Sequence, residues 1–139
     1  MTGPVFVDTA ALIALISRDD AWHALAQKQF TSLNGQNRPF LTSSAVLYEL
    51  LDGAAARGPL RSAALSLIHS IRNSRQWPVI HVTTGHMRKG EMLYASRMDK
   101  VWSLTDCTNM EIAHEHGVED VMTSDGDYQQ AGFRALLCA

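Results

Sequence analysis

Short apolar runs alternate along this chain with longer segments in which apolar residues recur at helical spacing. The apolar runs predict strands, the last at the edge of the sheet, over residues 5–8, 39–42, 78–82, 121–123 and 132–137. The periodic segments predict helices over residues 10–16, 20–30, 44–57, 60–71, 84–97 and 105–116. This alternation predicts an α/β domain built on a mainly parallel sheet of four or five strands.

Polar residues and glycines mark where the helices are expected to begin and end. Thr9 is the expected N-cap of the first helix and Thr105 that of the last, because both precede a periodic apolar stretch. Gly58-Pro59 is expected to break the chain between two helices, and Gly117 to end the last one.

Length and composition limit the class of protein. The chain has 139 residues, 46% of them hydrophobic, which predicts one compact domain over residues 1–139. Cys107 and Cys138 are too few for a disulfide framework or a zinc site, and favour a reducing cytoplasm. The longest apolar stretch, Ala10–Ile16, is far shorter than the about 20 residues that cross a bilayer, and no signal peptide is evident. We therefore expect a cytoplasmic protein with no membrane anchor.

Four acidic residues fall at positions where ligands bind in α/β proteins. Asp8 and Asp125 each close a predicted strand, and ligands bind outside the carboxyl ends of the strands in open α/β sheets. Glu49 borders the apolar stripe of its helix beside small residues. Asp106 falls in a first helical turn, where the helix dipole favours a carboxylate. Each acid alone is equally well explained as a cap, a turn residue or a solvated side chain, so the interpretation depends on their convergence.

A cluster of these carboxylates would need a counter-cation, because like charges repel. Oxygen donors without His or Cys suit a hard divalent ion, Mg²⁺ or Mn²⁺. Such an ion lowers the pKa of a bound water and neutralises charge on a phosphodiester under attack. The sequence has no Gly-x-Ser-x-Gly nucleophile motif and no Gly-x-x-x-x-Gly-Lys phosphate-binding loop. The pattern therefore favours metal-dependent phosphodiester hydrolysis.

Positive charge is concentrated in the middle of the chain. The net charge is -2, yet the segment from Arg57 to Lys100 holds eight of the 12 basic residues and only two acids, Glu91 and Asp99. This asymmetry is typical of a polyanion-binding face beside an acidic pocket, and equally of a solvated helical surface. Arg97 and Lys100 lie close in sequence to Asp106 and are candidates for binding an RNA phosphate.

Aromatic and histidine side chains give weaker indications. Trp102 is the best candidate for stacking on a base, although packing in the core is the stronger expectation for it. His114 and His116, two residues apart on a helix, point to nearly opposite faces and are expected at the surface rather than on a metal.

Four segments, taken in order along nearly the whole chain, resemble the PIN-domain family. They are residues 5–9 (VFVDT), 42–49 (TSSAVLYE), 99–107 (DKVWSLTDC), and 121–125 (VMTSD) followed by Tyr128 and residues 130–133 (QAGF). The resemblance implies a three-layer α/β/α sandwich around a central parallel sheet. It also implies a Mg²⁺- or Mn²⁺-dependent endoribonuclease directed at single strands.

The resemblance also implies roles and partners. Asp8 and Asp106 would be the principal metal ligands, and Glu49 and Asp125 would complete the catalytic site. Small PIN proteins of this length are most often VapC-type toxins of toxin–antitoxin pairs, which form homodimers and are inhibited by a cognate antitoxin protein.

Two positions depart from the family pattern. Asp127 stands where the closing motif often has His, and we expect it to lie outside the site. Asn109 stands where many relatives have Ser or Thr, three residues after Asp106. Both departures bear on metal preference and turnover, and neither removes a principal acid.

Two other functions are compatible with the same residues. One is a housekeeping PIN nuclease in RNA processing, and the other a non-catalytic PIN domain that binds RNA or a protein. Retention of all four acids argues against the second. The sequence does not specify which RNA is cleaved, how many metal ions act, or which antitoxin binds.

Overall fold

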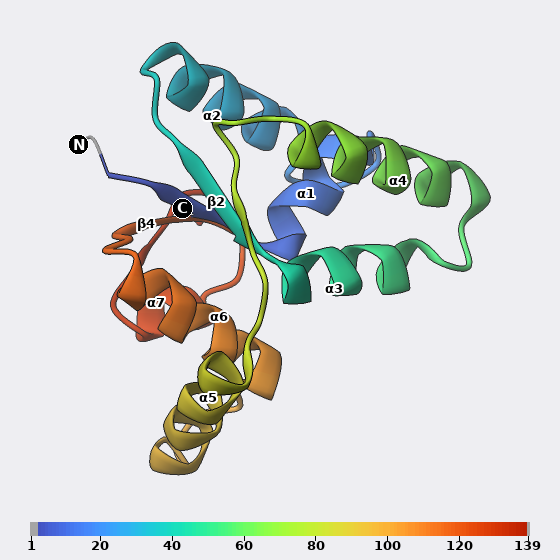
Figure 1. Cartoon of the computed structure of the whole chain (residues 1–139). Helices are drawn as coiled ribbons and strands as arrows, with labels where there is room; N and C mark the ends of the chain where they lie inside the picture. The colour runs from blue at the N-terminus through green and yellow to red at the C-terminus, as the bar shows by residue number, and fades with distance from the viewer. Residues whose placement is uncertain (1–2, 139) are drawn as a thin grey trace.

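The computed structural model describes residues 3–138 and has a central sheet in which every neighbouring pair of strands is parallel (Figure 1). The strands are β1 (Val5–Val7), β2 (Phe40–Ser43), β3 (Val79–Ile80), β4 (Asp120–Met122) and β5 (Arg134–Ala135). Their order across the sheet is β3-β2-β1-β4-β5. All the predicted strands are confirmed, with β5 at the edge, although most are shorter than the apolar runs that predict them.

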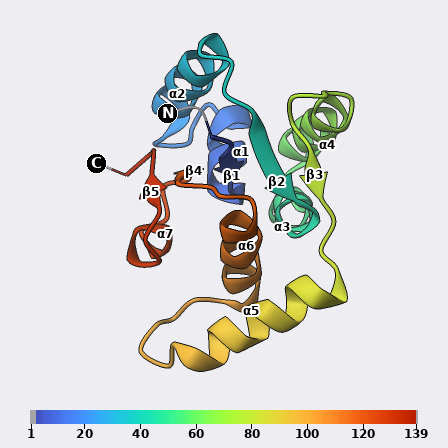
Figure 2. The same ribbon diagram turned by 60° about the vertical axis from the view of Figure 1, so that its left-hand side comes forward.

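Helices cover both faces of the sheet. They are α1 (Thr9–Ile16), α2 (His23–Gly35), α3 (Ser44–Ala54), α4 (Gly58–Arg72), α5 (Thr84–Ser96), α6 (Leu104–Glu115) and α7 (Asp127–Gln130). Figure 1 shows α1 to α4 on one side of the sheet and α6 and α7 on the other, which confirms the predicted three-layer sandwich. In Figure 2, α5 extends away from the body of the molecule beyond α6, the helix against which it packs.

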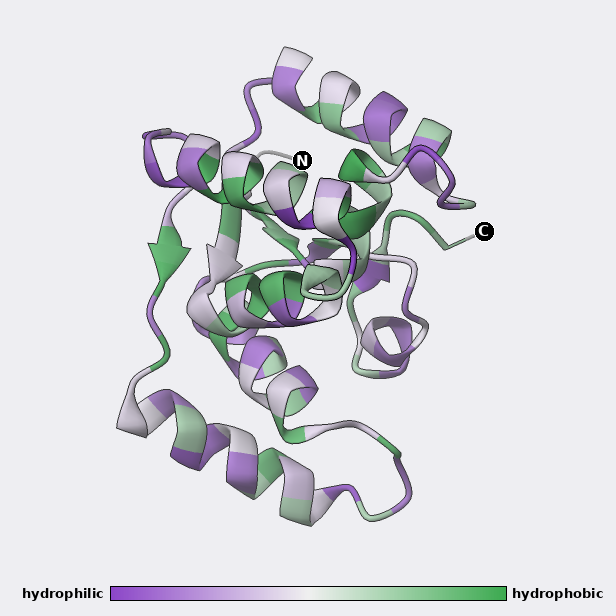
Figure 3. Ribbon diagram, turned by 90° about the vertical axis from the view of Figure 1, so that its right-hand side faces the viewer, coloured by the Kyte–Doolittle hydropathy of each residue, from purple (hydrophilic) through white to green (hydrophobic). Residues whose placement is uncertain are grey.

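The core lies at the two central strands. Val5, Phe6 and Val7 of β1 are fully buried, as are Val121 and Met122 of β4, because helices cover both sides of these strands. Figure 3 shows the complementary pattern on the helices, where hydrophobic and hydrophilic residues alternate around each turn. The continuous apolar runs that predict strands therefore mark the strands buried on both faces.

Several helix boundaries differ from the prediction, among them α2, which spans His23–Gly35, and α3, which ends at Ala54. The N-cap of α1 is Asp8 rather than Thr9, and that of α6 is Ser103 rather than Thr105. Ser103 is the N-cap in place of Thr105 because its hydroxyl accepts a hydrogen bond from the Asp106 backbone amide, while its own backbone amide donates to the Asp106 carboxylate. Gly58 and Pro59 do not lie between two helices. They form the first turn of α4, where a proline costs no hydrogen bond.

The remaining differences and agreements concern the end of α6, the start of α2 and the short helix α7. The residue expected to end α6, Gly117, adopts φ +68, the left-handed conformation that terminates helices. The second helix begins at His23, so Trp22 is its N-cap and not part of it. The short helix α7 was not predicted, because four residues are too few for a periodic signal.

The α5–α6 contact depends on a glycine. A Cβ at Gly90 of α5 would lie 2.3 Å from Thr108 Oγ1 and 3.0 Å from Thr108 Cα of α6. The two helices therefore approach more closely here than a larger residue would allow. Among the described residues, no helix has the length and apolar character that a bilayer-crossing segment requires.

A buried ion pair fixes the amino end of β4. Arg38, just before β2, donates to Asp120 Oδ2 at 3.0 Å, and both side chains are buried. The exposed Arg134 of β5 donates to the other carboxylate oxygen of Asp120 at 2.6 Å. The two guanidinium groups hold the pKa of Asp120 below its ordinary value. This cluster lies at the end of the sheet opposite the carboxyl ends of the strands.

Candidate active site

The strand order reverses at the carboxyl ends of β1 and β4, the position at which open α/β sheets have a ligand-binding crevice. From β1 the chain proceeds to β2 and then β3 on one side, whereas β4 and β5 lie on the other side. This reversal of strand order is the point at which open α/β sheets bind ligands. Asp8 directly follows β1, and its amide donates to the carbonyl oxygen of Met122 at the end of β4, at 3.1 Å.

Asp8 is buried in this crevice and held by two hydroxyl groups. Thr123 Oγ1 donates to Asp8 Oδ2 at 2.9 Å, and the Tyr128 hydroxyl lies 3.4 Å from Asp8 Oδ1. Burial raises the pKa of Asp8 from 3.8 to about 7, although the hydrogen bond from Thr123 opposes the shift. The charges of Glu49 and Asp106 add to the increase, so both carboxylates lie within electrostatic reach of Asp8.

Glu49 reaches the crevice from the neighbouring helix α3. The Thr9 hydroxyl donates to Glu49 Oε1 at 2.9 Å, so the first residue of α1 holds the glutamate on the same side as Asp8. Partial burial raises the pKa of Glu49, and the charges of Asp106 and Asp125 raise it further. Glu49 is the most exposed of the four predicted acids, and its Oε2 atom faces no recorded hydrogen-bond donor among the described residues.

Asp106 is fixed by the N-terminal capping box of α6. Its amide donates to Ser103 Oγ at 3.0 Å, and its Oδ2 accepts from the Ser103 amide at 3.2 Å. The prediction that Asp106 lies in the first turn of a helix is thus confirmed, with Ser103 as the cap. Burial raises the pKa of Asp106, and the nearby charge of Asp125 adds to the increase.

Asp125 and Asp127 form the fourth side of the crevice, on the turn after β4. The Asp127 amide donates to Asp125 Oδ1 at 2.9 Å, and the Asp125 amide donates to Thr123 Oγ1 at 3.0 Å. Carboxylate oxygens of Asp106, Asp125 and Asp127 lie within 4.8 Å of one another. Asp127 thus lies beside Asp106 and Asp125, and its carboxylate adds negative charge there.

Among the described residues, the structure thus brings the carboxylates of Asp106, Asp125 and Asp127 within 4.8 Å of one another, and places Asp8 and Glu49 outside this group but within electrostatic reach of it. Within residues 3–138, none of these carboxylates forms an ion pair with a Lys, Arg or His side chain. Burial raises the pKa of Asp127, and the charge of Lys100 opposes this increase. The site therefore concentrates negative charge that the chain itself leaves uncompensated.

Asn109 supports the site from below. It is fully buried, and its Oδ1 accepts a hydrogen bond from the Ser43 hydroxyl at 2.5 Å. Ser43 is the N-cap of α3 and accepts the Val46 amide at 3.2 Å. The Asn109 amide therefore anchors the first turn of the helix that carries Glu49. Its Nδ2 atom has no hydrogen-bond partner in the described part of the chain.

The candidate RNA-binding residues lie beside the crevice, on the loop between α5 and α6. Arg97 donates two hydrogen bonds of 3.0 Å to the carboxylate of Asp99, so its charge is partly neutralised. Lys100 forms no ion pair among the described residues. Trp102 is buried, which confirms the expectation of core packing, and the cations of Arg97 and Lys100 lie 5.1 and 6.0 Å from its ring centroid.

The rest of the basic segment does not form one surface with this loop. Four of its arginines belong to α4 or its flanks and two basic residues belong to α5, and Figure 2 shows these helices at separate ends of the molecule. His114 and His116 are exposed, as expected.

The residues that orient the acids were not predicted as parts of the site. Thr123, Thr9 and Ser103 each bond one carboxylate, and Tyr128 contacts Asp8 from a fully buried position. Their sequence signal was present, because each stands within three residues of a predicted acid in the four motifs. A hydroxyl next to an acid in sequence has many ordinary uses, and only the fold shows that these hydroxyls converge.

The chain belongs to the PIN-domain family, whose model, described as PIN domain, matches residues 5–134. The resemblance found in the four motifs is therefore confirmed. This assignment makes the protein a nuclease, an enzyme class that hydrolyses phosphodiester bonds in RNA.

The chain is similar to the 23S rRNA-specific endonuclease VapC20 of Mycobacterium tuberculosis, with 28% identity over 129 residues that cover 93% of this chain and 95% of that protein. The crystal structure of M. tuberculosis VapC20, described as a sarcin-ricin loop cleaving toxin, has a TM-score of 0.82 and 27% identity, covering 93% and 95% of the two chains. The structure of VapBC2 from Rickettsia felis bound to a promoter DNA fragment has a TM-score of 0.69 and 12% identity, covering 95% and 96%, and shares the fold. The predicted similarity to VapC-type toxins is confirmed.

Proposed function

We propose that this protein is the toxin of a toxin–antitoxin pair, and that it cleaves RNA with Mg²⁺ or Mn²⁺ held by Asp8, Asp106, Asp125 and Glu49. The observation that carries the proposal is the convergence of these acids, from four separate segments, on the crevice between β1 and β4. Asp127 lies close enough to Asp106 and Asp125 to take part as well.

The donor set fits a hard divalent cation. Every side chain offered is a carboxylate, and oxygen ligands are those that Mg²⁺ and Mn²⁺ prefer. Burial raises the pKa of Asp8 to about 7, so at neutral pH this carboxylate is charged only at a cost that a nearby cation would remove. When bound, such an ion supplies positive charge that polarises the phosphodiester and acidifies water.

The side chains themselves prepare the site for hydrolysis. Thr123 and Tyr128 fix the orientation of Asp8, and the capping box of α6 fixes that of Asp106, so neither carboxylate has to be ordered when the substrate arrives. Glu49 keeps Oε1 on the Thr9 hydroxyl and leaves Oε2 to accept a proton from the attacking water. Its raised pKa makes the Glu49 carboxylate a stronger proton acceptor than an ordinary glutamate.

The substrate is proposed by analogy with VapC20, to which this chain is similar over nearly its whole length. A relative that is 28% identical is described as a 23S rRNA-specific endonuclease, and its structure as that of a sarcin-ricin loop cleaving toxin. We propose the same ribosomal RNA loop as the first substrate to test, which would place the action in the cytoplasm. A cognate antitoxin protein and a homodimeric state complete the proposal, and co-purification with the product of a neighbouring gene and sedimentation equilibrium test them.

Cleavage of purified ribosomes and of a synthetic sarcin-ricin loop RNA tests the proposed activity. With Mg²⁺ or Mn²⁺ the wild-type protein is expected to produce a discrete 23S fragment, and EDTA to abolish it. Asp8→Asn and Asp106→Asn should each lose activity at least a hundredfold, whereas Asp52→Asn, a neutralised carboxylate on the same helix as Glu49, should retain it. Equal cleavage by all three variants would refute the assignment of the site.

Expression in cells separates the toxin role from a housekeeping nuclease. Induction of the wild-type protein is expected to arrest growth, and Asp8→Asn to leave growth unaffected. Normal growth despite active RNA cleavage in vitro would instead support a housekeeping role.

A further inference from the structure

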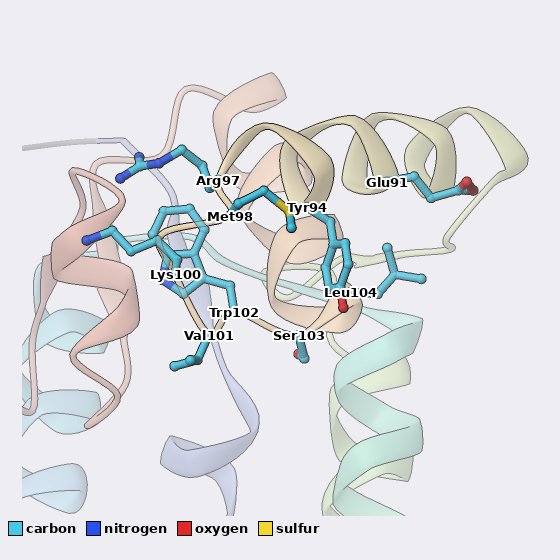
Figure 4. A pocket seen from close by; sticks show the side chains of 9 residues that line it. All are labelled: Glu91, Tyr94, Arg97, Met98, Lys100, Val101, Trp102, Ser103 and Leu104. Atoms are coloured by element: carbon cyan, nitrogen blue, oxygen red, sulfur yellow. The ribbon is translucent and has the colours of Figure 1, made fainter.

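A hollow of about 690 Å³ lies beside the proposed active site, between the end of α5 and the start of α6 (Figure 4). Figure 4 shows Tyr94 and Leu104 on one side of it, with the side chain of Met98 extending towards Tyr94 and the ring of Trp102 on the other side. The volume is within the range of pockets that hold small organic groups. None of the carboxylates proposed to hold the metal ion lines this hollow.

The lining of the hollow combines exposed apolar side chains with Glu91, Arg97, Lys100 and Ser103. Met98 is 87% exposed, Val101 95% and Tyr94 53%, although each has a large hydrophobic side chain. Trp102 lies beneath them and is only 5% exposed. A group of neighbouring exposed apolar side chains is typical of a ligand-binding or protein-binding surface.

The cationic edge of the hollow faces the proposed active site. In Figure 4 the side chains of Arg97 and Lys100 point away from Tyr94 and Leu104, towards the segment that contains α7. Both residues line the hollow, and their cationic groups lie 5.1 and 6.0 Å from the centroid of the Trp102 ring. A phosphate beside the acids would therefore meet Lys100 next, and then the apolar hollow.

The hollow is also held at a fixed position relative to Asp106. Ser103 forms part of its wall, and the same residue makes both hydrogen bonds of the capping box with Asp106. A group bound in the hollow would thus lie a set distance from a proposed metal ligand.

We propose that this hollow binds an unpaired nucleobase of the RNA substrate, next to the phosphodiester that is cleaved, with Lys100 on the intervening phosphate. The base packs against Tyr94, Met98 and Val101. Trp102 is not the stacking surface, because it is buried and its ring is covered by Arg97 and Lys100. The indole instead positions the two cations. This inference rests on the proposed function, since it assigns part of the substrate of the same site.

The observations favour a nucleobase over a protein as the occupant. A stable protein interface needs about 20–30 residues on each side, whereas this hollow is lined by residues of one loop and the two helix ends that flank it. The combination of an apolar surface with adjacent cations is how single-stranded nucleic acids are recognised, with phosphates on the cations and bases on the apolar groups.

A substrate with a missing base tests the proposal. After the cut in the sarcin-ricin loop RNA has been mapped, each nucleotide flanking it is replaced in turn by an abasic nucleotide, and kcat/KM is measured. Removal of the base that occupies the hollow should lower kcat/KM of the wild-type protein roughly 5- to 150-fold, the effect of losing one stacked base. The double variant Tyr94→Ala/Met98→Ala should lose a similar factor on intact RNA.

The decisive result is the coupling between the two changes. In the double variant, removal of that base should cost less than twofold further, because its partner surface is already gone. Met92→Ala, which removes another exposed methionine of α5 outside this hollow, should behave as wild type. Tyr94→Phe should retain the wild-type response, and thermal unfolding should show that every variant is folded.

Three outcomes would overturn the inference. In the first, the double variant has the kcat/KM of the wild-type protein. In the second, removal of the base lowers kcat/KM by the same factor in the double variant as in the wild-type protein. In the third, the double variant changes its oligomeric state with unchanged RNA cleavage, which would make the hollow a protein contact. If the wild-type protein cuts no RNA, the proposed function fails. Anisotropy measurements of the intact loop RNA and of loop RNAs with an abasic nucleotide at each position in turn, on the wild-type protein and the double variant, would then still decide whether the hollow binds a base.

Discussion

Replacing Asp8 by asparagine is predicted to stabilise the metal-free protein at alkaline pH while removing its activity. The carboxyl group of Asp8 is buried, and its pKa rises from an ordinary value of 3.8 to about 7. Asparagine has nearly the same shape, so its Oδ1 can accept from Thr123 and its Nδ2 can donate to the Tyr128 hydroxyl. The substitution therefore removes the cost of a buried charge without removing its hydrogen-bond partners.

The sign and size of the effect follow from proton binding. Between pH 3.8 and about 7 the folded protein binds the Asp8 proton more tightly than the unfolded chain, so stability falls as pH rises through this window. At about 1.4 kcal/mol for each pH unit, Asp8 lowers the stability by about 4 kcal/mol at pH 8, where it is ionised in the folded protein, and by about 1.5 kcal/mol at pH 5, where folding requires it to take up a proton. Asp8→Asn should gain up to these amounts in the free energy of unfolding.

Urea unfolding in EDTA, followed by tryptophan fluorescence at pH 5 and pH 8, measures this gain. Asp19→Asn, which neutralises an exposed carboxylate outside the site, should change stability by less than about 0.5 kcal/mol at both pH values. The reasoning is refuted if Asp8→Asn is no more stable than wild type at pH 8, or if its gain is the same at both pH values.

Three further predictions concern the metal and the scaffold. Saturating Mg²⁺ or Mn²⁺, at about 100 times its dissociation constant, should raise wild-type stability by about 2.7 kcal/mol and that of Asp8→Asn much less, measured by thermal unfolding. Arg38→Ala should cost about 3 kcal/mol, because it leaves Asp120 buried with only an exposed partner, and an unchanged urea midpoint would contradict this. Gly90→Ala should lower the free energy of unfolding by about 1–3 kcal/mol, because the added methyl group would clash with Thr108. Gly85→Ala, where the nearest atom is 3.6 Å from the added Cβ, should be neutral or stabilising. Equal melting temperatures for the two variants would rule out the close approach of α5 to α6.

The strands and the acids at their ends were predictable because burial on both faces leaves a continuous apolar run. Val5–Val7 and Val121–Met122 are such runs, and parallel pairing brings the residues that follow them to one edge. The acid at the start of α6 was predictable from the preference of helix N-termini for carboxylates. The fold class and the gathering of Asp8, Asp106 and Asp125 thus follow from local patterns combined with one topological rule.

Other features were not predictable because they depend on competition or on tertiary contacts. Ser103 and Thr105 are both good caps, and the choice between them is made by reciprocal bonding with Asp106. Asp127 joins the acids only because the turn after β4 directs its amide onto Asp125. The basic segment appears continuous in sequence, yet the fold divides it between α4 and the region around α5, and the charge of Lys100 acts on Asp127.

The location of a bound Mn²⁺ ion tests the central claim most directly. Anomalous X-ray diffraction from a crystal soaked in Mn²⁺ would locate the ion without reference to activity. The account predicts one or two anomalous peaks among the carboxylates of Asp8, Asp106 and Asp125, with Glu49 or Asp127 alongside. A well-ordered crystal with no peak in the crevice between β1 and β4, or with Mn²⁺ bound only elsewhere on the chain, would contradict it.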